Sequence, residues 1–350
     1  MVATNNKEIP FFNYELPLDD QSKLDEMAIT LTDQIFPEWA CEEKNVSYFT
    51  NGITNKILKV ETSNATDQMH RVIIRVFGKN TENYIDRDEE LKNFLLLHSV
   101  GLSSAVYGTF KNGLVVGFLH GDTLNVNSIR DAGISKKVGK AVANLHQIKD
   151  SNNGKEAMIF DKIKDYFKIV SYDFGCVKKQ KCFDDYFGKI DLKKDFEELK
   201  VLIKENPDDL VFCHNDLLCG NILFDQKKDA IHLIDYEYAG VNFRLFDIGN
   251  HFNEWAGVDE VDYSLLPLKD EKMNFLKSYL DELYQSEDAK EGKIDEMLTK
   301  LPLYEAASHY FWALWAVVQA TNSVIDFDYV KYAVLRHSMF RKTLNEFIEK

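Results

Sequence analysis

The sequence predicts an α+β fold with two lobes, a smaller sheet-rich lobe followed by a larger helical one. Short apolar runs separated by turn residues recur between Val46 and Leu119, which is typical of antiparallel strands. Helical spacing of apolar residues returns after that region, at Val138, Val142 and Leu145. One later pair of strand-like runs, within Val211–Trp255, has polar residues at both of its edges.

Composition is that of an ordinary globular protein. The 350 residues are 45% hydrophobic and 28% charged, enough to bury the core of one large domain or of two lobes. With 42 basic and 57 acidic residues, the net charge of −15 disfavours nucleic acid and anionic membrane and favours a cationic ligand. Solubility alone also explains this charge. We expect no nucleic-acid partner.

No targeting segment, zinc-binding pattern or disulfide framework is visible. The first residues lack the features of a signal peptide, and the most apolar run, Phe311–Ala320, is too short to span a bilayer. The five cysteines have unrelated spacings, which predicts neither a zinc site nor a disulfide framework. We therefore expect a cytoplasmic protein without stable membrane insertion.

An N-terminal helical extension is predicted over residues 1–40. Apolar residues from Leu24 to Ile35 follow helical spacing, Asp20 is an available cap, and Pro37 ends the pattern. This helix packs on the first lobe or supports self-association, and a homodimer is compatible with the second alternative.

The first lobe is predicted over residues 41–119. It is expected to hold one helix and five strands, in the order Val46–Phe49, Lys56–Val60, Arg71–Phe77, helix 86–98, Val106–Phe110 and Leu114–Leu119. An Arg in an apolar strand is costly to leave unpaired. We therefore expect Arg75 to pair with Glu90 of the helix, the alternative being an edge-strand Arg that reaches solvent.

The second lobe is predicted over residues 120–350, after a hinge at His120–Asp122. A helix ends at His146, which we expect to be a packing or hydrogen-bonding residue. Residues 150–208 are interpreted as helices with loops, without a motif.

Polar residues surround a predicted hairpin in this lobe. Its strands are Ile222–Phe224 and Ile231–Ile234, joined by a charged turn. Before it and at its edges stand polar side chains that a hydrophobic hairpin does not need: His214, Asn215, Asp216, Asn221 and Asp235.

Their spacing is that of phosphoryl transfer. Kinases place a catalytic Asp, an Asn ligand five residues later, and a metal-binding Asp on the next strand. Asp216, Asn221 and Asp235 match this order, which predicts catalysis by Asp216 and Mg²⁺ binding by the other two. Asn215 stands where protein kinases have Arg. After Asp235, this chain has Tyr236 and Glu237 where protein kinases have Phe and Gly. A protein-kinase-like enzyme without a regulated activation segment is indicated.

Such a fold needs groups for ATP. The turn holding Asn51, Gly52, Thr54 and Asn55 would cover the phosphates with its backbone amides, although a plain hairpin turn explains it equally well. Arg75 would contact the α- and β-phosphates. Backbone groups near Phe118 and Leu119 would meet the adenine ring.

The motif HND-x4-NIL followed by IDYEY-x3-N-x4-DIGNHFNEW resembles the signature of the choline/ethanolamine kinases. The resemblance runs from about Val46 to the C-terminus. The segment NHFNEWAG and Leu218 are more similar to the ethanolamine branch. The resemblance implies an aminoglycoside phosphotransferase/choline kinase type of fold. It also implies ATP-dependent phosphorylation of ethanolamine, the first step of the CDP-ethanolamine route to phosphatidylethanolamine, with choline or dual specificity as the alternative.

The resemblance also implies roles around the hairpin. His214 would brace the catalytic loop, and Asp247 would hold that loop through backbone amides. Asn250 and His251 would be structural. Glu254 would face the substrate cleft, the alternative being an exposed helix carboxylate.

Aromatic residues are implied for the amine pocket. Trp312 and Trp315 lie three apart on one helix, a spacing that core residues also show. These two match family pocket positions together with Tyr238, Phe327 and Tyr332. A primary ammonium also needs hydrogen-bond acceptors, and the candidates are Asp235, Glu237 and Glu254. The aromatics favour an amino alcohol without choosing between choline and ethanolamine.

Two rival functions stay open. One is a small-molecule kinase of the same fold that acts on choline, an aminoglycoside or a sugar. The other is a non-catalytic kinase-like binding or scaffold protein, against which the presence of Asp216, Asn221 and Asp235 argues.

Overall fold

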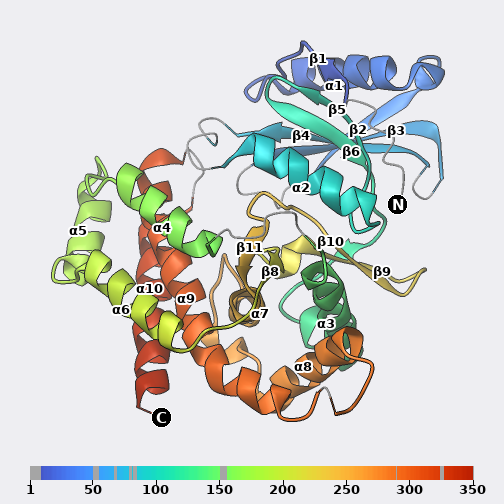
Figure 1. The fold of residues 1–350 in the computed structure, drawn as a ribbon. Coiled ribbons are helices and arrows are strands. Elements are labelled where there is room, and N and C mark those ends of the chain that lie inside the picture. The colour runs from blue at the N-terminus through green and yellow to red at the C-terminus, as the bar shows by residue number, and fades with distance from the viewer. Residues whose placement is uncertain are drawn as a thin grey trace. The chain divides into compact units, whose positions relative to one another are not determined.

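A computed structural model describes residues 9–49, 55–66, 69–78, 81, 85–149, 156–288, 290–323 and 327–349. The chain forms two compact units. Unit 1 holds the chain up to Asp122 together with Leu223–Glu237, and unit 2 holds Thr123–Ile222 and the chain from Tyr238 onward. The elements of both units are labelled in Figure 1.

Unit 1 is built on a six-stranded sheet in the order β1-β5-β6-β4-β3-β2. All neighbours are antiparallel except β1, which is parallel to β5. The strands are β1 (Phe11–Phe12), β2 (Lys44–Phe49), β3 (Asn55–Thr66), β4 (Met69–Phe77), β5 (Val106–Phe110) and β6 (Gly113–Gly117). The five predicted strands are confirmed, but β3 continues further than expected and β6 ends two residues early.

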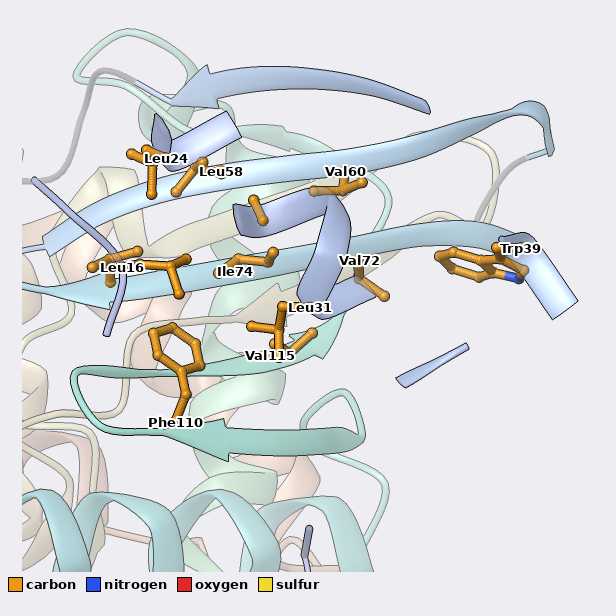
Figure 2. Close-up of a cluster of buried hydrophobic side chains, with 12 residues drawn as sticks. Leu16, Leu24, Leu31, Trp39, Leu58, Val60, Val72, Ile74, Phe110 and Val115 are labelled. Carbon is orange, nitrogen blue, oxygen red and sulfur yellow. The ribbon is translucent and has the colours of Figure 1, made fainter. Parts of the chain in front are cut away.

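One face of this sheet carries the hydrophobic core. Leu58, Ile74 and Val115 stand side by side across three strands and are fully buried. The helix α1 (Gln21–Ile35) covers them, and its Leu24 and Leu31 lie in the same cluster (Figure 2). Asp20 caps α1 by accepting a hydrogen bond from the Lys23 amide. The N-terminal helix therefore packs on the sheet and belongs to unit 1, as does the 3₁₀ turn η1 (Pro37–Trp39).

The opposite face of β4 carries Arg75, because successive side chains of a strand point to opposite faces. The helix α2 (Arg87–Ser99) supplies Glu90 to Arg75. Asp86 caps α2, and the acidic residues of its first turn stabilise its N-terminus.

The predicted hairpin forms as β9 (Ile222–Asp225) and β10 (Ala230–Leu233). From the sequence, this hairpin was predicted to belong to the second lobe, residues 120–350. In the structure, residues Leu223–Glu237 group with unit 1. The physical reason lies just after β10. Tyr236 packs edge-on against Phe94 of α2, and its hydroxyl donates to the Leu102 carbonyl.

Unit 2 is mainly helical. Its helices are η3 (Ser128–Arg130), α3 (Ala132–His146), α4 (Met158–Ile169), α5 (Val177–Phe187), α6 (Leu192–Glu205), η4 (Cys219–Asn221), α7 (Arg244–Asn253), η5 (Glu254–Ala256), η6 (Tyr263–Leu265), α8 (Lys269–Leu283), α9 (Lys293–Asn322) and α10 (Tyr329–Ile348). The strands β8 (Leu210–Cys213) and β11 (Gly240–Phe243) pair antiparallel. The two-residue β7 (Asp122–Thr123) lies where the chain passes from unit 1 to unit 2.

The helix α9 is the core of unit 2. Its side chains are buried almost without interruption from Leu301 to Ala320, and α10 lies alongside it (Figure 1). A helix that is buried on all sides shows little amphipathic periodicity. Among the described residues, no helix has both the length and the apolar character needed to cross a membrane.

We predict that Leu31→Ala destabilises the protein by about 2–5 kcal/mol, because it removes a fully buried side chain between α1 and the sheet. Urea unfolding measures this loss. Glu26→Ala, at an exposed position of the same helix, serves as the control. Equal stability of the two variants would mean that α1 is not part of the core of unit 1.

Candidate active site

A tight loop in unit 2 follows β8 and carries the predicted catalytic residues. Asn215 adopts a left-handed backbone conformation, φ 67°, which is uncommon for a residue other than glycine. Its side chain holds it there. The Asn215 Nδ2 donates to the Tyr238 carbonyl at 2.9 Å, and its Oδ1 accepts from Asn242 at 2.8 Å. The polar residue at position 215 therefore fixes the loop to β11 and the residues before it.

Asp247, in the first turn of α7, anchors the same loop. Its carboxylate is fully buried and accepts from the backbone amides of His214 at 2.8 Å and Asn215 at 2.7 Å. Burial alone would raise the pKa of Asp247, but the hydrogen bonds and charges of His146 and His214 hold it below its usual value. The expected contact between Asp247 and the loop amides is confirmed.

His146 supports Asp247 from α3. Its Nε2 lies 3.0 Å from the Asp247 carboxylate and its Nδ1 lies 2.8 Å from the Tyr279 hydroxyl. A carboxylate only accepts, so Nε2 donates to Asp247, and Nδ1 shares a hydrogen bond with the Tyr279 hydroxyl. The prediction of a hydrogen-bonding role for His146 is confirmed. The hydrogen bond from this histidine is one of the interactions that keep the pKa of the buried Asp247 low.

Asp216 and Asn221 lie together at the end of the loop. The Asn221 Nδ2 donates to the Asp216 carboxylate at 3.0 Å and to the Asp216 carbonyl at 2.9 Å. Both residues are buried. Because the amide nitrogen faces Asp216, the amide oxygen is the atom of Asn221 that is left to bind a cation.

His251 and Asn250 of α7 have structural hydrogen bonds. The His251 Nδ1 donates to the Leu217 carbonyl at 3.1 Å, and its Nε2 accepts from the Trp255 indole at 3.3 Å. Burial lowers the pKa of His251 to about 4. The Asn250 Oδ1 accepts from Ser308 at 2.8 Å and from Trp312 at 2.7 Å.

In unit 1, Arg75 binds three carboxylates. Its Nη1 lies 2.7 Å from Glu90, and its Nη2 lies 2.5 Å from Asp235 and 2.7 Å from Glu237. Burial would lower the pKa of Arg75, but the three acids raise it above its usual value. The expected ion pair with Glu90 is confirmed, and an Arg that reaches solvent is excluded. Asp235 holds a left-handed conformation, φ 65°.

Glu237 and Arg87 complete this cluster and were not assigned to it from the sequence. Glu237 is bound by Arg75 at 2.7 Å and by the Asn55 amide at 3.1 Å, partners that the sequence did not indicate. Burial and the neighbouring Asp235 raise the pKa of Glu237 to about 7. Arg87 lies 2.6 Å from Glu90 and stacks on Phe77. The only sequence feature that could have indicated this cluster is the position of Glu237, two residues after Asp235.

The aromatic residues predicted for the amine pocket form two sets in unit 2, which the ring of Tyr329 connects by contacts with Trp315 and Phe327. Trp312 contacts both Tyr238 and Trp315 edge-on, with ring centroids 5.3 Å apart in each case. The Trp315 indole donates to the Tyr238 hydroxyl at 3.0 Å. Phe327 lies 5.5 Å from Tyr332. All of these except Phe327 are buried, as core residues would also be.

Glu254 stands beside this group. It is 3% exposed, which excludes the alternative of a solvent-exposed helix carboxylate. Its Oε1 lies 2.5 Å from the guanidinium of Arg336, a residue that no sequence pattern had indicated. The predicted role of Glu254 as an acceptor for the ammonium therefore concerns a carboxylate that already has a guanidinium partner.

The remaining predicted nucleotide contacts are Asn51, Gly52, Thr54, Phe118 and Leu119. Asn51, Gly52 and Thr54 lie outside the described residues. Phe118 and Leu119 follow β6, and the Phe118 ring stacks under Arg71 with 5.7 Å between the guanidinium carbon and the ring centroid.

Comparison with known proteins identifies the family. The sequence profile of the choline/ethanolamine kinases matches residues 46–341. The chain belongs to this family. It is 32% identical over 348 residues to Homo sapiens ethanolamine kinase 1, an alignment that covers 97% of this chain and 76% of the human protein.

Solved structures of family members confirm the predicted kinase-like fold. A Plasmodium vivax ethanolamine kinase has a TM-score of 0.79 at 26% identity, covering 93% of this chain and 91% of its own. A Cryptosporidium parvum choline kinase has a TM-score of 0.77 at 22% identity, covering 93% and 96%. Kinases of this family use a nucleotide as the phosphoryl donor and a small molecule as the acceptor.

We predict that Asp247→Asn loosens the catalytic loop, because an amide can offer an acceptor to only one of the two backbone N–H groups. Losing one hydrogen bond to a charged group costs about 1.5–3 kcal/mol. Hydrogen exchange at the His214 and Asn215 amides should accelerate accordingly. Asp161→Asn, on the exposed side of α4, is the control. Unchanged protection of the two amides would contradict the anchoring role.

We also predict that stability falls as pH drops from about 6.5 toward 4, with His251 contributing on the order of 3 kcal/mol. The unfolded imidazole takes up its proton first, near pH 6.5, whereas in the folded state both ring nitrogens are already bonded in the neutral form. Urea unfolding across this range measures the slope. His251→Gln should reduce this slope and leave the part that the buried His309 and His337 contribute, because burial lowers the pKa of both. The exposed His98→Gln should leave the slope unchanged, and equal slopes in the two variants would contradict the role of His251.

Proposed function

We propose that this protein transfers the γ-phosphoryl group of ATP to the hydroxyl of ethanolamine, giving phosphoethanolamine and ADP. The observation that carries the proposal is the Asp216 carboxylate, held beside Asn221 on a loop that Asp247 pins through two amides. Relatives named as ethanolamine kinases in Homo sapiens and Plasmodium vivax support the choice of acceptor.

Asp216 acts on the substrate hydroxyl. Its carboxylate accepts the hydroxyl proton or orients the hydroxyl toward the phosphorus. Because the transition state of phosphoryl transfer is loose, orientation contributes more than basicity. The bond from Asn221 fixes the direction of this carboxylate, and His214 braces the loop through its backbone amide.

Asn221 and Asp235 are the proposed magnesium ligands. Both present oxygen atoms, which hard divalent cations prefer, and the Asn221 amide oxygen is turned away from the Asp216 bond. The ion neutralises charge on the β- and γ-phosphates when it is bound.

Arg75 is the proposed phosphate-binding cation. Its partner Glu90 on α2 fixes one side of the guanidinium, as expected for the strand–helix pair of a kinase. The turn with Asn51, Gly52, Thr54 and Asn55 is proposed to cover the phosphates. The backbone near Phe118 and Leu119 is proposed to contact adenine.

The substrate ammonium is proposed to lie against the aromatic group of Tyr238, Trp312, Trp315, Phe327 and Tyr332. An ammonium over an indole gains on the order of 1–2 kcal/mol when it is desolvated. Such rings attract choline as well, so the choice of a primary amine depends on hydrogen-bond acceptors near them.

The test is a panel of acceptors, with ADP release as the readout. Ethanolamine, choline, an aminoglycoside and a sugar are compared at one ATP and Mg²⁺ concentration. We expect the highest kcat/KM with ethanolamine. Preference for any other acceptor would replace the proposed substrate, and failure to bind Mg·ATP by calorimetry would favour a non-catalytic protein.

We predict that Asp216→Ala lowers kcat by at least ~10²-fold with the fold intact, the usual scale for a positioned acid or base. Steady-state ADP release measures kcat, and circular dichroism checks folding. Asp185→Asn, in a surface pair with Lys181 on α5, should keep normal turnover. Near-normal turnover of the Asp216 variant would remove this residue from its role.

A further inference from the structure

Arg336 of α10 is the centre of a buried polar network in unit 2. It is 2% exposed. Its Nη1 donates to the Glu254 carboxylate at 2.5 Å and to the Tyr332 hydroxyl at 2.9 Å, and its Nη2 donates to Ser308 Oγ at 3.1 Å. One guanidinium thus joins η5, α9 and its own helix.

The network continues to the aromatic group. Ser308 Oγ donates to Asn250 Oδ1 at 2.8 Å, and the Trp312 indole donates to the same oxygen at 2.7 Å. Arg336 is therefore linked directly to Tyr332 and through two residues to Trp312. It connects the carboxylate and the rings that the proposed function assigns to the amine.

A buried ion pair is a weak source of stability, because the loss of hydration offsets most of the attraction. What it supplies here is fixed geometry. The planar guanidinium directs its donors in set directions, so it can hold an acid and two hydroxyls at once. A lysine ammonium has no such rigid fork.

Fixed acceptors discriminate between amines. A primary ammonium has three N–H donors that need acceptors, whereas a trimethylammonium has none. Because Arg336 compensates the charge of Glu254, the pair offers little general attraction to a cation. It still offers the second carboxylate oxygen of Glu254, which Arg336 does not bind and to which an N–H group can donate.

We propose that Arg336 is a positioning residue that sets specificity for a primary amine, by holding the Glu254 carboxylate and the Tyr332 hydroxyl where they accept ammonium N–H groups. The inference rests on the proposed function and adds a residue to it. Arg336 acts through Glu254 and the aromatic group, and does not itself bind the substrate.

A double-mutant cycle tests this. Arg336→Met, Glu254→Gln and the double variant are compared with the wild-type protein for KM of ethanolamine, KM of ATP and the ethanolamine-to-choline ratio of kcat/KM. Each single change should raise the KM for ethanolamine about tenfold, the effect of losing one charge-assisted hydrogen bond, and leave the KM for ATP within about twofold. The ethanolamine-to-choline ratio of kcat/KM should fall by a similar factor.

The double variant decides whether the two residues act together. If Arg336 works through Glu254, its effect should be no greater than that of the stronger single change. Additive effects, or equal rises in the KM values for both substrates, would show a merely structural role and overturn the proposal. An unchanged KM for ethanolamine in Arg336→Met would do the same.

Two further variants guard against misfolding. Arg336→Lys keeps the charge but cannot span Glu254 and Ser308 together, so it should fold and give an intermediate ratio of kcat/KM. Arg341→Met removes another ion-paired arginine of α10, bound to Asp195 and Glu198 and not to the aromatic group, and should leave both KM values unchanged. If Arg336→Lys keeps the wild-type ethanolamine-to-choline ratio of kcat/KM, the proposal is overturned, because a positive charge alone would then be sufficient.

The wild-type measurement separates this inference from the proposed function. If the wild-type protein does not phosphorylate ethanolamine, the proposed function fails and takes the inference with it. If the wild-type protein prefers ethanolamine and the Arg336 variants keep that preference, only the inference fails.

Discussion

The site in unit 2 depends on one buried carboxylate. Asp247 accepts from two successive amides of the catalytic loop and from His146, and it thereby satisfies two buried N–H groups that would be costly to leave unpaired. The loop is held so firmly that Asn215 can keep a left-handed conformation, which costs of order 1–3 kcal/mol elsewhere. Asp216 and Asn221 owe their positions to this anchor, and an enzyme that works by orientation needs that rigidity.

Charge compensation recurs in both units. In unit 1, Arg75 is surrounded by Glu90, Asp235 and Glu237. In unit 2, Arg336 holds Glu254. Each arginine is buried and would be costly without its acids. Each also fixes the direction of a carboxylate that the proposed chemistry uses, Asp235 for the metal and Glu254 for the amine.

The features that could be predicted from the sequence were those whose residues lie close together along the chain. The five-residue step from Asp216 to Asn221, the hairpin before Asp235 and the Arg in a strand all stand within short stretches. Arg336 could not be assigned, because its partner Glu254 lies 82 residues away in the sequence and is brought to it only by packing. Arg87 lies three residues from Glu90 on α2, but its place beside Glu237 depends on the fold. The helix α9 is buried on all sides and so lacks the periodicity from which its role could be inferred.

The most direct test of the account is a crystal structure with Mg²⁺, a non-hydrolysable ATP analogue and ethanolamine. The account predicts the ethanolamine hydroxyl within about 2.6–3.2 Å of the Asp216 carboxylate, as a proton-accepting base requires. It places the ammonium against Trp312 with an N–H group directed at Glu254. A hydroxyl directed away from Asp216, or an ammonium bound outside the aromatic group, would contradict it.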